Sequence, residues 1–200
     1  CREEVGNDFA ISIKMNSADF QKGGFSPEDS IQVAKLFSDS GIDNIEISGG
    51  TYEQPRLLGL DKVSINPKRS ENRKESTIAR EAYFLSYAEE IAKVVNIPLM
   101  VTGGFRTKEG MEAALADGAC EIVGVGRPLC ANPYAIKELL AGQIDELPKY
   151  EKTLSIGPWW LSPTSPFRLI QAINAFSAQA WFYQQIKKMG NGLTPDLTLK

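Results

Sequence analysis

Two glycine-rich stretches of this chain each follow a short apolar run that is typical of a β-strand. They read Val101-Thr-Gly-Gly104 and Val123-Gly-Val-Gly-Arg127, and a helix-like segment separates them. Glycine at a strand end is unfavourable unless the backbone turns tightly or approaches another group closely. Because this happens at two consecutive strand ends, the pattern predicts a bound ligand that the backbone contacts directly.

The chain holds no histidine, which removes several kinds of catalytic chemistry. Ser-His-Asp and Cys-His nucleophiles and histidine-ligated metals all need an imidazole. The three cysteines, Cys1, Cys120 and Cys130, are spaced irregularly, which indicates reduced thiols in a cytosolic setting rather than disulfides or a zinc site. A dinucleotide fingerprint also fails, since Leu129 stands where the third glycine of G-x-G-x-x-G should lie.

Composition places the chain among ordinary globular proteins. Of its 200 residues 42% are hydrophobic and 24% charged, with 22 basic and 25 acidic side chains. A net charge of -3 without a basic concentration argues against nucleic acid or an anionic membrane as partner, and no apolar run could span a bilayer. We expect a cytoplasmic protein that binds a small molecule. The chain begins with Cys1 rather than Met and shows no signal-peptide pattern, which predicts processing or a longer parent.

The first part of the chain alternates between strand and helix patterns. Polar and apolar residues alternate over 9–16, which predicts a strand, and Ser26-Pro27 opens a helix that ends at Gly41. A second strand over 44–48 stops at Gly49-Gly50. The polar stretch over 51–78 is long enough to predict a lid or binding loop.

The rest of the chain continues this rhythm and then leaves it. Further predicted elements are a helix through Phe84, Ala88, Ile91 and Val95, strands over 97–102 and 121–125, and helices over 107–117 and 132–142. Beyond Asp145 an aromatic loop over 157–163 precedes a C-terminal helix. The apolar stripe expected on that helix comprises Leu169, Ile173, Phe176, Ala180 and Trp181.

Four strands that alternate with helices predict parallel βαβ units, either doubly wound or rolled into a (β/α)8 barrel. Ser12, Lys14 and Asn16 give the first strand a polar face, which favours a barrel interior over a sheet covered by helices on both sides. A barrel needs eight strands, so we predict an α/β fold in which residues 1–200 form one partial domain, the C-terminal half of a TIM barrel. In such barrels the loops after the seventh and eighth strands commonly bind phosphate through backbone N–H groups.

Longer motifs carry a more specific resemblance. They are ISIKMNSADFQKGGFSPEDS, IEISGGTYEQP, REAYFLSYAEEIA, PLMVTGGFRT and GVGRPLCANP. In this order they resemble the C-terminal half of the old yellow enzyme family of FMN-dependent ene-reductases, and the resemblance weakens only after about Gly142. It implies an oxidoreductase with an FMN-binding barrel that takes hydride from NAD(P)H and gives it to activated alkenes such as enones.

The resemblance also implies roles for individual residues. Lys14 matches a basic residue beside the flavin's pyrimidine edge, where a cation favours the reduced, anionic flavin. The two phosphate loops match Gly103 with Gly104 and Gly126 with Arg127, and Arg127 would offer a fork of donors. Ser48, Thr102 and Phe105 match the same rim. The family's substrate-binding pair, usually His with His or Asn, and its tyrosine proton donor match no position here. We therefore assign no catalytic residue, and neither Tyr52 nor Tyr83 takes that role.

Each of these assignments has a structural alternative. Lys14 could pair with an interior carboxylate, the Gly103-Gly104 pair could serve only a turn, and Arg127 could form a surface ion pair. Function has alternatives as well. The chain could be a non-catalytic half-barrel that binds FMN or phosphate, with a second copy completing eight strands, or an inactive fragment with open sheet edges. A barrel that binds a sugar phosphate would leave the Lys14 match unexplained.

Overall fold

The computed structural model describes residues 1–19, 23–48 and 84–198. The expectations for Gly49-Gly50, the polar stretch over 51–78, Tyr52 and Tyr83 therefore lie outside the described residues. The described chain divides into two compact units, one of residues 1–48, 84–105 and 109–125 and one of residues 106–108 and 126–198. The single partial domain over 1–200 stays a prediction.

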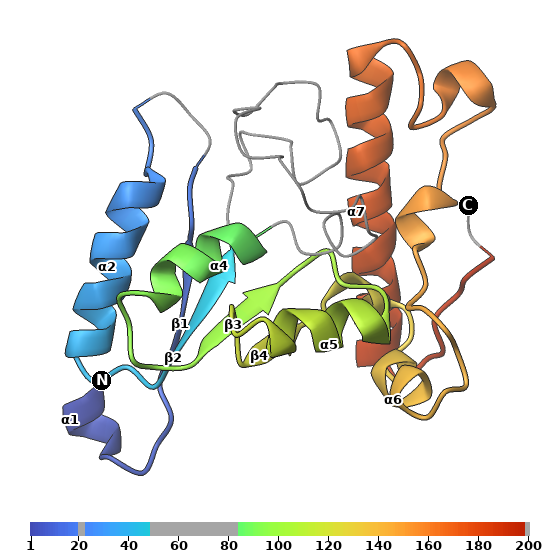
Figure 1. Ribbon diagram of the computed structural model, residues 1–200. Helices are drawn as coiled ribbons and strands as arrows, with labels where there is room; N and C mark the ends of the chain where they lie inside the picture. Colours follow the sequence, from blue (N-terminus) through green and yellow to red (C-terminus); the bar gives the residue numbers. More distant parts are fainter. Residues whose placement is uncertain (20–22, 49–83, 199–200) are drawn as a thin grey trace. The chain divides into compact units, whose positions relative to one another are not determined.

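Four parallel strands form the sheet of the first unit, as the sequence predicted (Figure 1). The strands are β1 (Ser12–Asn16), β2 (Asn44–Ser48), β3 (Leu99–Thr102) and β4 (Ile122–Gly124). Their order in the sheet is β1-β2-β3-β4, so each strand pairs with the next along the chain. A doubly wound sheet reverses its order in the middle, whereas sequential order is that of a barrel wall.

The first strand starts three residues later than the alternation predicted. The Arg2 guanidinium, on the short helix α1 (Arg2–Val5), donates to the Phe9 carbonyl at 2.6 Å and also pairs with Asp43. Phe9 therefore uses its carbonyl outside the sheet, and its side chain is 61% exposed. A side-chain donor from 7 residues away carries no periodic signal, so the alternation over 9–16 could not show where pairing begins.

Three helices cover one face of this sheet. They are α2 (Pro27–Asp39), α4 (Leu85–Ala92) and α5 (Lys108–Ala116). The Ser26 hydroxyl and the Asp29 carboxylate each accept a hydrogen bond from the other's backbone N–H, which fixes the start of α2. The apolar residues predicted for the helix around α4, Phe84, Ala88, Ile91 and Val95, are all buried.

Alternate strand residues separate a buried face from a polar one. Ile45, Ile47, Leu99 and Val101 are at most 2% exposed and belong to a core shared with alanines of all three helices, Ala34, Ala88 and Ala114. The next residues along the strands, Lys14, Glu46, Met100 and Ile122, form one paired layer on the opposite face. Among the described residues the helices of this unit pack on the buried face. The opposite face, which carries Lys14 and Glu46 beside Met100 and Ile122, is therefore the side expected to face a barrel interior.

The second unit holds the end of the chain. Its elements are η3 (Arg127–Cys130), α6 (Ala135–Leu140), η4 (Tyr150–Lys152), η5 (Trp159–Leu161) and α7 (Arg168–Gly190). The predicted helix over 132–142 is shorter because the Asn132 side chain accepts from the Tyr134 N–H at 3.0 Å and forms a turn instead. Trp181 and Phe182 form this unit's core with Ala131 and Leu154.

The apolar stripe predicted for the C-terminal helix is wrong in part. Trp181 is buried, but Leu169, Ile173 and Phe176 are 72%, 41% and 61% exposed. The buried face instead includes Asn174, whose amide accepts from the Ile156 N–H and donates to the Leu161 carbonyl. The periodicity of apolar residues could not show that a polar residue is buried through hydrogen bonds to loop backbone. No helix among the described residues is long and apolar enough to cross a membrane.

We predict that Gly124→Ala destabilises the chain by about 1–3 kcal/mol, the usual cost of overpacking. A Cβ at Gly124 would lie 1.9 Å from the Thr102 Oγ1 and 2.8 Å from the Thr102 Cβ, so backbone must move. Urea unfolding measures the loss. The matched control is Gly126→Ala, where a Cβ would meet nothing within 4 Å and where we expect a change within about 0.5 kcal/mol. Equal effects of the two substitutions would contradict this packing argument.

Candidate functional site

Strands β3 and β4 end side by side, which brings the starts of their two glycine-rich loops to one edge of the sheet. Thr102 pairs with Gly124, and the Gly103 N–H donates to the Gly124 carbonyl at 3.3 Å. Gly103 and Gly104 then adopt φ of 114° and 87°, values that favour glycine. The turn therefore needs both glycines, and it places backbone at the carboxyl edge of the sheet where ligands of parallel sheets bind.

Gly126 differs from the first pair because its own backbone does not require glycine. Its φ is -113°, and a Cβ would point into space with no atom within 4 Å. It directly precedes η3 in the second unit, where the Leu129 N–H donates to its carbonyl at 3.0 Å. A glycine that neither conformation nor packing demands fits a position that something outside the described chain approaches closely.

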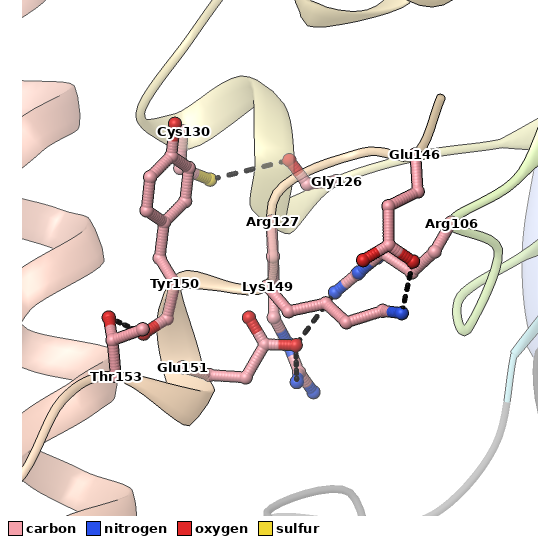
Figure 2. Close-up of polar contacts among 9 residues, drawn as sticks. All are labelled: Arg106, Gly126, Arg127, Cys130, Glu146, Lys149, Tyr150, Glu151 and Thr153. Carbon is pink, nitrogen blue, oxygen red and sulfur yellow. Dashed lines mark hydrogen bonds and ion pairs between the residues drawn. The ribbon is translucent and has the colours of Figure 1, made fainter. Parts of the chain in front are cut away.

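Arg127 lies beside a buried ion pair of the second unit. Figure 2 shows Arg127 and Arg106 on either side of Glu151. The Arg106 Nη2 lies 2.9 Å from the Glu151 Oε1, and the Arg127 Nη1 lies 3.9 Å from the same oxygen. The Arg127 side chain is 49% exposed, so its guanidinium faces solvent as well as the carboxylate. Arg127 is thus both paired, as the structural alternative held, and accessible to an anion.

Lys14 lies on the sheet face opposite the helices of the first unit, where it pairs with an interior carboxylate. Its Nζ is 2.6 Å from the Glu46 Oε1, on the residue directly opposite in β2. Burial works to raise the pKa of Glu46, but the hydrogen bond and charge of Lys14 and the nearby Thr102 hydroxyl outweigh it, and the pKa is lowered. The Thr102 Oγ1 is buried, without hydrogen-bond geometry to any described residue. This face offers polar groups to a ligand.

Other rim residues take structural places. Phe105 is 1% exposed and belongs to the hydrophobic core of the first unit, while the Ser48 carbonyl accepts from the Ser17 N–H. Cys120 and Cys130 are free thiols, and burial raises the pKa of both, which lowers their reactivity. Among the described residues no cluster of three or more histidine, cysteine or acidic side chains could hold a metal.

Three residues of this region were missed by the sequence analysis. Glu46 could have been found, because the alternating strands over 12–16 and 44–48 place it opposite Lys14 once they are paired in parallel. Arg106 and Glu151 gave no such signal, since they are 45 residues apart and meet through loops.

We predict that Lys14→Met lowers stability at neutral pH more than in acid. A carboxyl whose pKa is lowered by folding stabilises the protein above the unfolded value of about 4.3, and this contribution is lost as pH falls through the folded pKa. Without Lys14, burial alone would raise the pKa of Glu46. Urea unfolding at pH 7 and at about pH 3.5 should show a difference from the parent of up to about 1 kcal/mol that shrinks in acid.

The control for that measurement is Lys35→Met. Lys35 pairs with Asp39 on the exposed surface of α2, where both side chains are about 60% exposed. We expect no measurable change from this substitution at either pH. An equal loss from Lys14→Met at both pH values would contradict the role given to the ion pair.

Comparisons with known proteins place this chain among flavin enzymes. A search against models of protein families finds no match. The chain is 39% identical over 144 residues to the NADH-dependent flavin oxidoreductase iliE of Hypocrea jecorina (strain QM6a), covering 70% of this chain and 33% of that protein. It is 31% identical over 188 residues to an NADH oxidase of Thermoanaerobacter brockii, covering 94% of this chain and 26% of that one.

A solved structure of a 2-naphthoyl-CoA reductase complex shares the fold with a TM-score of 0.57 and 25% identity, over 73% of this chain and 20% of that chain. The chain thus spans a third or less of the length of these three proteins. The sequential parallel sheet and the shared sequence agree with the resemblance seen in the motifs. The chain is similar over most of its length to NADH-dependent flavin oxidoreductases, and its fold is part of a (β/α)8 barrel.

Proposed function

We propose that this chain forms part of an FMN-dependent oxidoreductase of the ene-reductase type. Such an enzyme takes hydride from NAD(P)H and transfers it to an activated alkene such as an enone. The observation that carries the proposal is the paired ending of β3 and β4, where the Gly103 N–H donates to the Gly124 carbonyl and Gly103-Gly104 turn at positive φ. Relatives named NADH-dependent flavin oxidoreductase support the cofactor class.

The family resemblance assigns residues to both ends of FMN. The phosphate would lie against the backbone of Gly103, Gly104 and Gly126 and the Arg127 guanidinium. The Gly103 N–H already donates to the Gly124 carbonyl, so it is not counted among the phosphate donors. The open space at the Cβ position of Gly126 is the observation that supports this placement. Lys14, on the sheet face opposite the helices, would lie at the pyrimidine edge of the flavin.

Lys14 would favour the reduced cofactor. Bound FMN supplies the hydride chemistry, and its reduced form is negatively charged near N1. The Nζ of Lys14 is held by Glu46, so the cation has a fixed place on this face before any ligand arrives. A preorganised cation stabilises charge more effectively than one that must be ordered on binding.

The absence of histidine favours a second candidate function. The 200 residues contain no histidine, so they supply no histidine pair to bind a substrate carbonyl. The second candidate is therefore a half-barrel that binds FMN or phosphate without catalysis by this chain alone, or with a second copy as partner. For either candidate function we propose a cytoplasmic location. NAD(P)H is proposed as the hydride donor, without a preference between NADH and NADPH.

Retention of FMN tests the proposed cofactor. We expect the purified chain, mixed with FMN and freed of excess, to keep an absorbance band near 450 nm. Arg127→Ala should lose it, because the phosphate loses its forked donor, and Arg127→Lys should recover only part, because lysine cannot bind in two places. A band that survives Arg127→Ala would contradict the assignment of Arg127.

Turnover separates the two candidate functions. NAD(P)H added without oxygen should bleach the flavin band of the loaded chain, and an enone added afterwards should restore it if the chain is an ene-reductase. Retained flavin that NAD(P)H does not bleach would instead favour the binding half-barrel. Failure to retain flavin at all would contradict the ene-reductase and leave only a half-barrel that binds phosphate.

A further inference from the structure

Glu151 lies between two arginines of the second unit and was not singled out by any motif. Its Oε1 is 2.9 Å from the Arg106 Nη2 and 3.9 Å from the Arg127 Nη1 (Figure 2). The Arg106 side chain is 10% exposed, whereas that of Arg127 is 49% exposed. One carboxylate therefore links a buried guanidinium to one that solvent and ligands reach.

The position of Glu151 is fixed from two sides. Glu151 lies on η4, whose Tyr150 ring packs against Trp181 with 5.6 Å between ring centroids. Just before η4, the Leu147 N–H donates to the Arg106 carbonyl at 2.7 Å, and Leu147 is fully buried. Backbone pairing and aromatic packing thus hold the carboxylate in place before any ligand binds.

Two guanidinium groups lie at one carboxylate in this cluster. Arg106 and Arg127 both approach the Oε1 of Glu151. The neighbouring Lys149 and Glu146 pair with each other at 2.5 Å, and the hydrogen bond from Lys149 lowers the pKa of Glu146. Arg127 is the more exposed of the two arginines beside the Glu151 carboxylate, so an anion that approaches from solvent meets the Arg127 side chain first.

We propose that Glu151 is a positioning residue for the phosphate of a flavin nucleotide, acting through Arg127. An arginine loses rotamer freedom when it binds an anion, and a carboxylate that already restrains it reduces that loss. The proposal rests on the proposed function for its ligand. It goes against the simplest electrostatic expectation, since removing a negative charge should by itself strengthen phosphate binding.

The two effects have opposite signs, which makes Glu151→Gln informative. We expect this substitution to raise the dissociation constant for FMN by up to about fivefold, the scale of a partly exposed ion pair, and to leave that for riboflavin unchanged, because riboflavin lacks the phosphate. Flavin fluorescence titration measures both. An FMN affinity that is unchanged or tighter in Glu151→Gln would overturn the proposal.

Glu146→Gln is the matched control, since it removes the same charge from the same cluster at a residue paired with Lys149. We expect it to leave FMN binding unchanged or slightly tighter. A loss equal to that of Glu151→Gln would show that net charge, and not the restraint on Arg127, decides affinity, and would overturn the proposal.

Loss of the partner of buried Arg106 could itself disturb the fold. The double variant Arg106→Leu with Glu151→Gln removes both members of that ion pair, and its melting temperature reports whether the fold survives. With the fold intact, FMN binding should remain weakened because the Glu151 carboxylate no longer restrains Arg127. Recovery of the parental FMN affinity would overturn the proposal.

Inorganic phosphate distinguishes failure of this inference from failure of the proposed function. Phosphate should raise the melting temperature of the parent chain, and Glu151→Gln should abolish most of that rise. If phosphate acts in this way but FMN does not bind, the proposed function fails and the positioning role stands for phosphate alone. If phosphate has no effect on the parent, there is no anion site and the inference fails too.

Discussion

The close approach of β3 and β4 at Thr102 and Gly124 is the constraint on which the described site depends. A Cβ at Gly124 would overlap the Thr102 side chain, so these strands can pair at this point only with glycine on one of them. Their pairing brings Gly103 beside the Gly124 carbonyl and starts both glycine-rich loops at one edge of the sheet. Packing, rather than ligand binding, thus explains Gly124, one of the four glycines in the two motifs. Gly124 is also the one for which no ligand contact was predicted.

The two basic residues assigned to the cofactor share a local arrangement. Lys14 contacts Glu46, and Arg127 lies within 4 Å of Glu151. The sequence alone presents such pairing as an alternative to cofactor binding, but the two are compatible. A half-exposed cation beside a more buried carboxylate has a restricted position and still presents donors to an anion. Pairing therefore does not argue against a binding role at either place.

Sequence reasoning predicted the local and periodic features of the fold. Alternation gave β1 and β2, the Ser26 cap gave the start of α2, and the polar face of β1 distinguished a barrel from a doubly wound sheet. It failed where contacts between residues distant in sequence determine the structure. Examples are the hydrogen bond from Arg2 to the Phe9 carbonyl and the hydrogen bond from Asn174 to the Leu161 carbonyl. For the same reason Glu151 escaped notice, since no spacing in the chain links it to Arg106 and Arg127.

The sequential sheet also constrains whatever pairs with its first strand. Among the described residues β1 pairs on one side only, with β2. A strand that joined its other side in parallel would have to follow the same alternation, with apolar residues level with Ile13 and Met15 and every second side chain in the layer of Lys14 and Glu46. A slip of one residue would turn its apolar face into the polar interior. The four described strands therefore fix the alternation of apolar and polar residues that any strand paired with the free side of β1 must have.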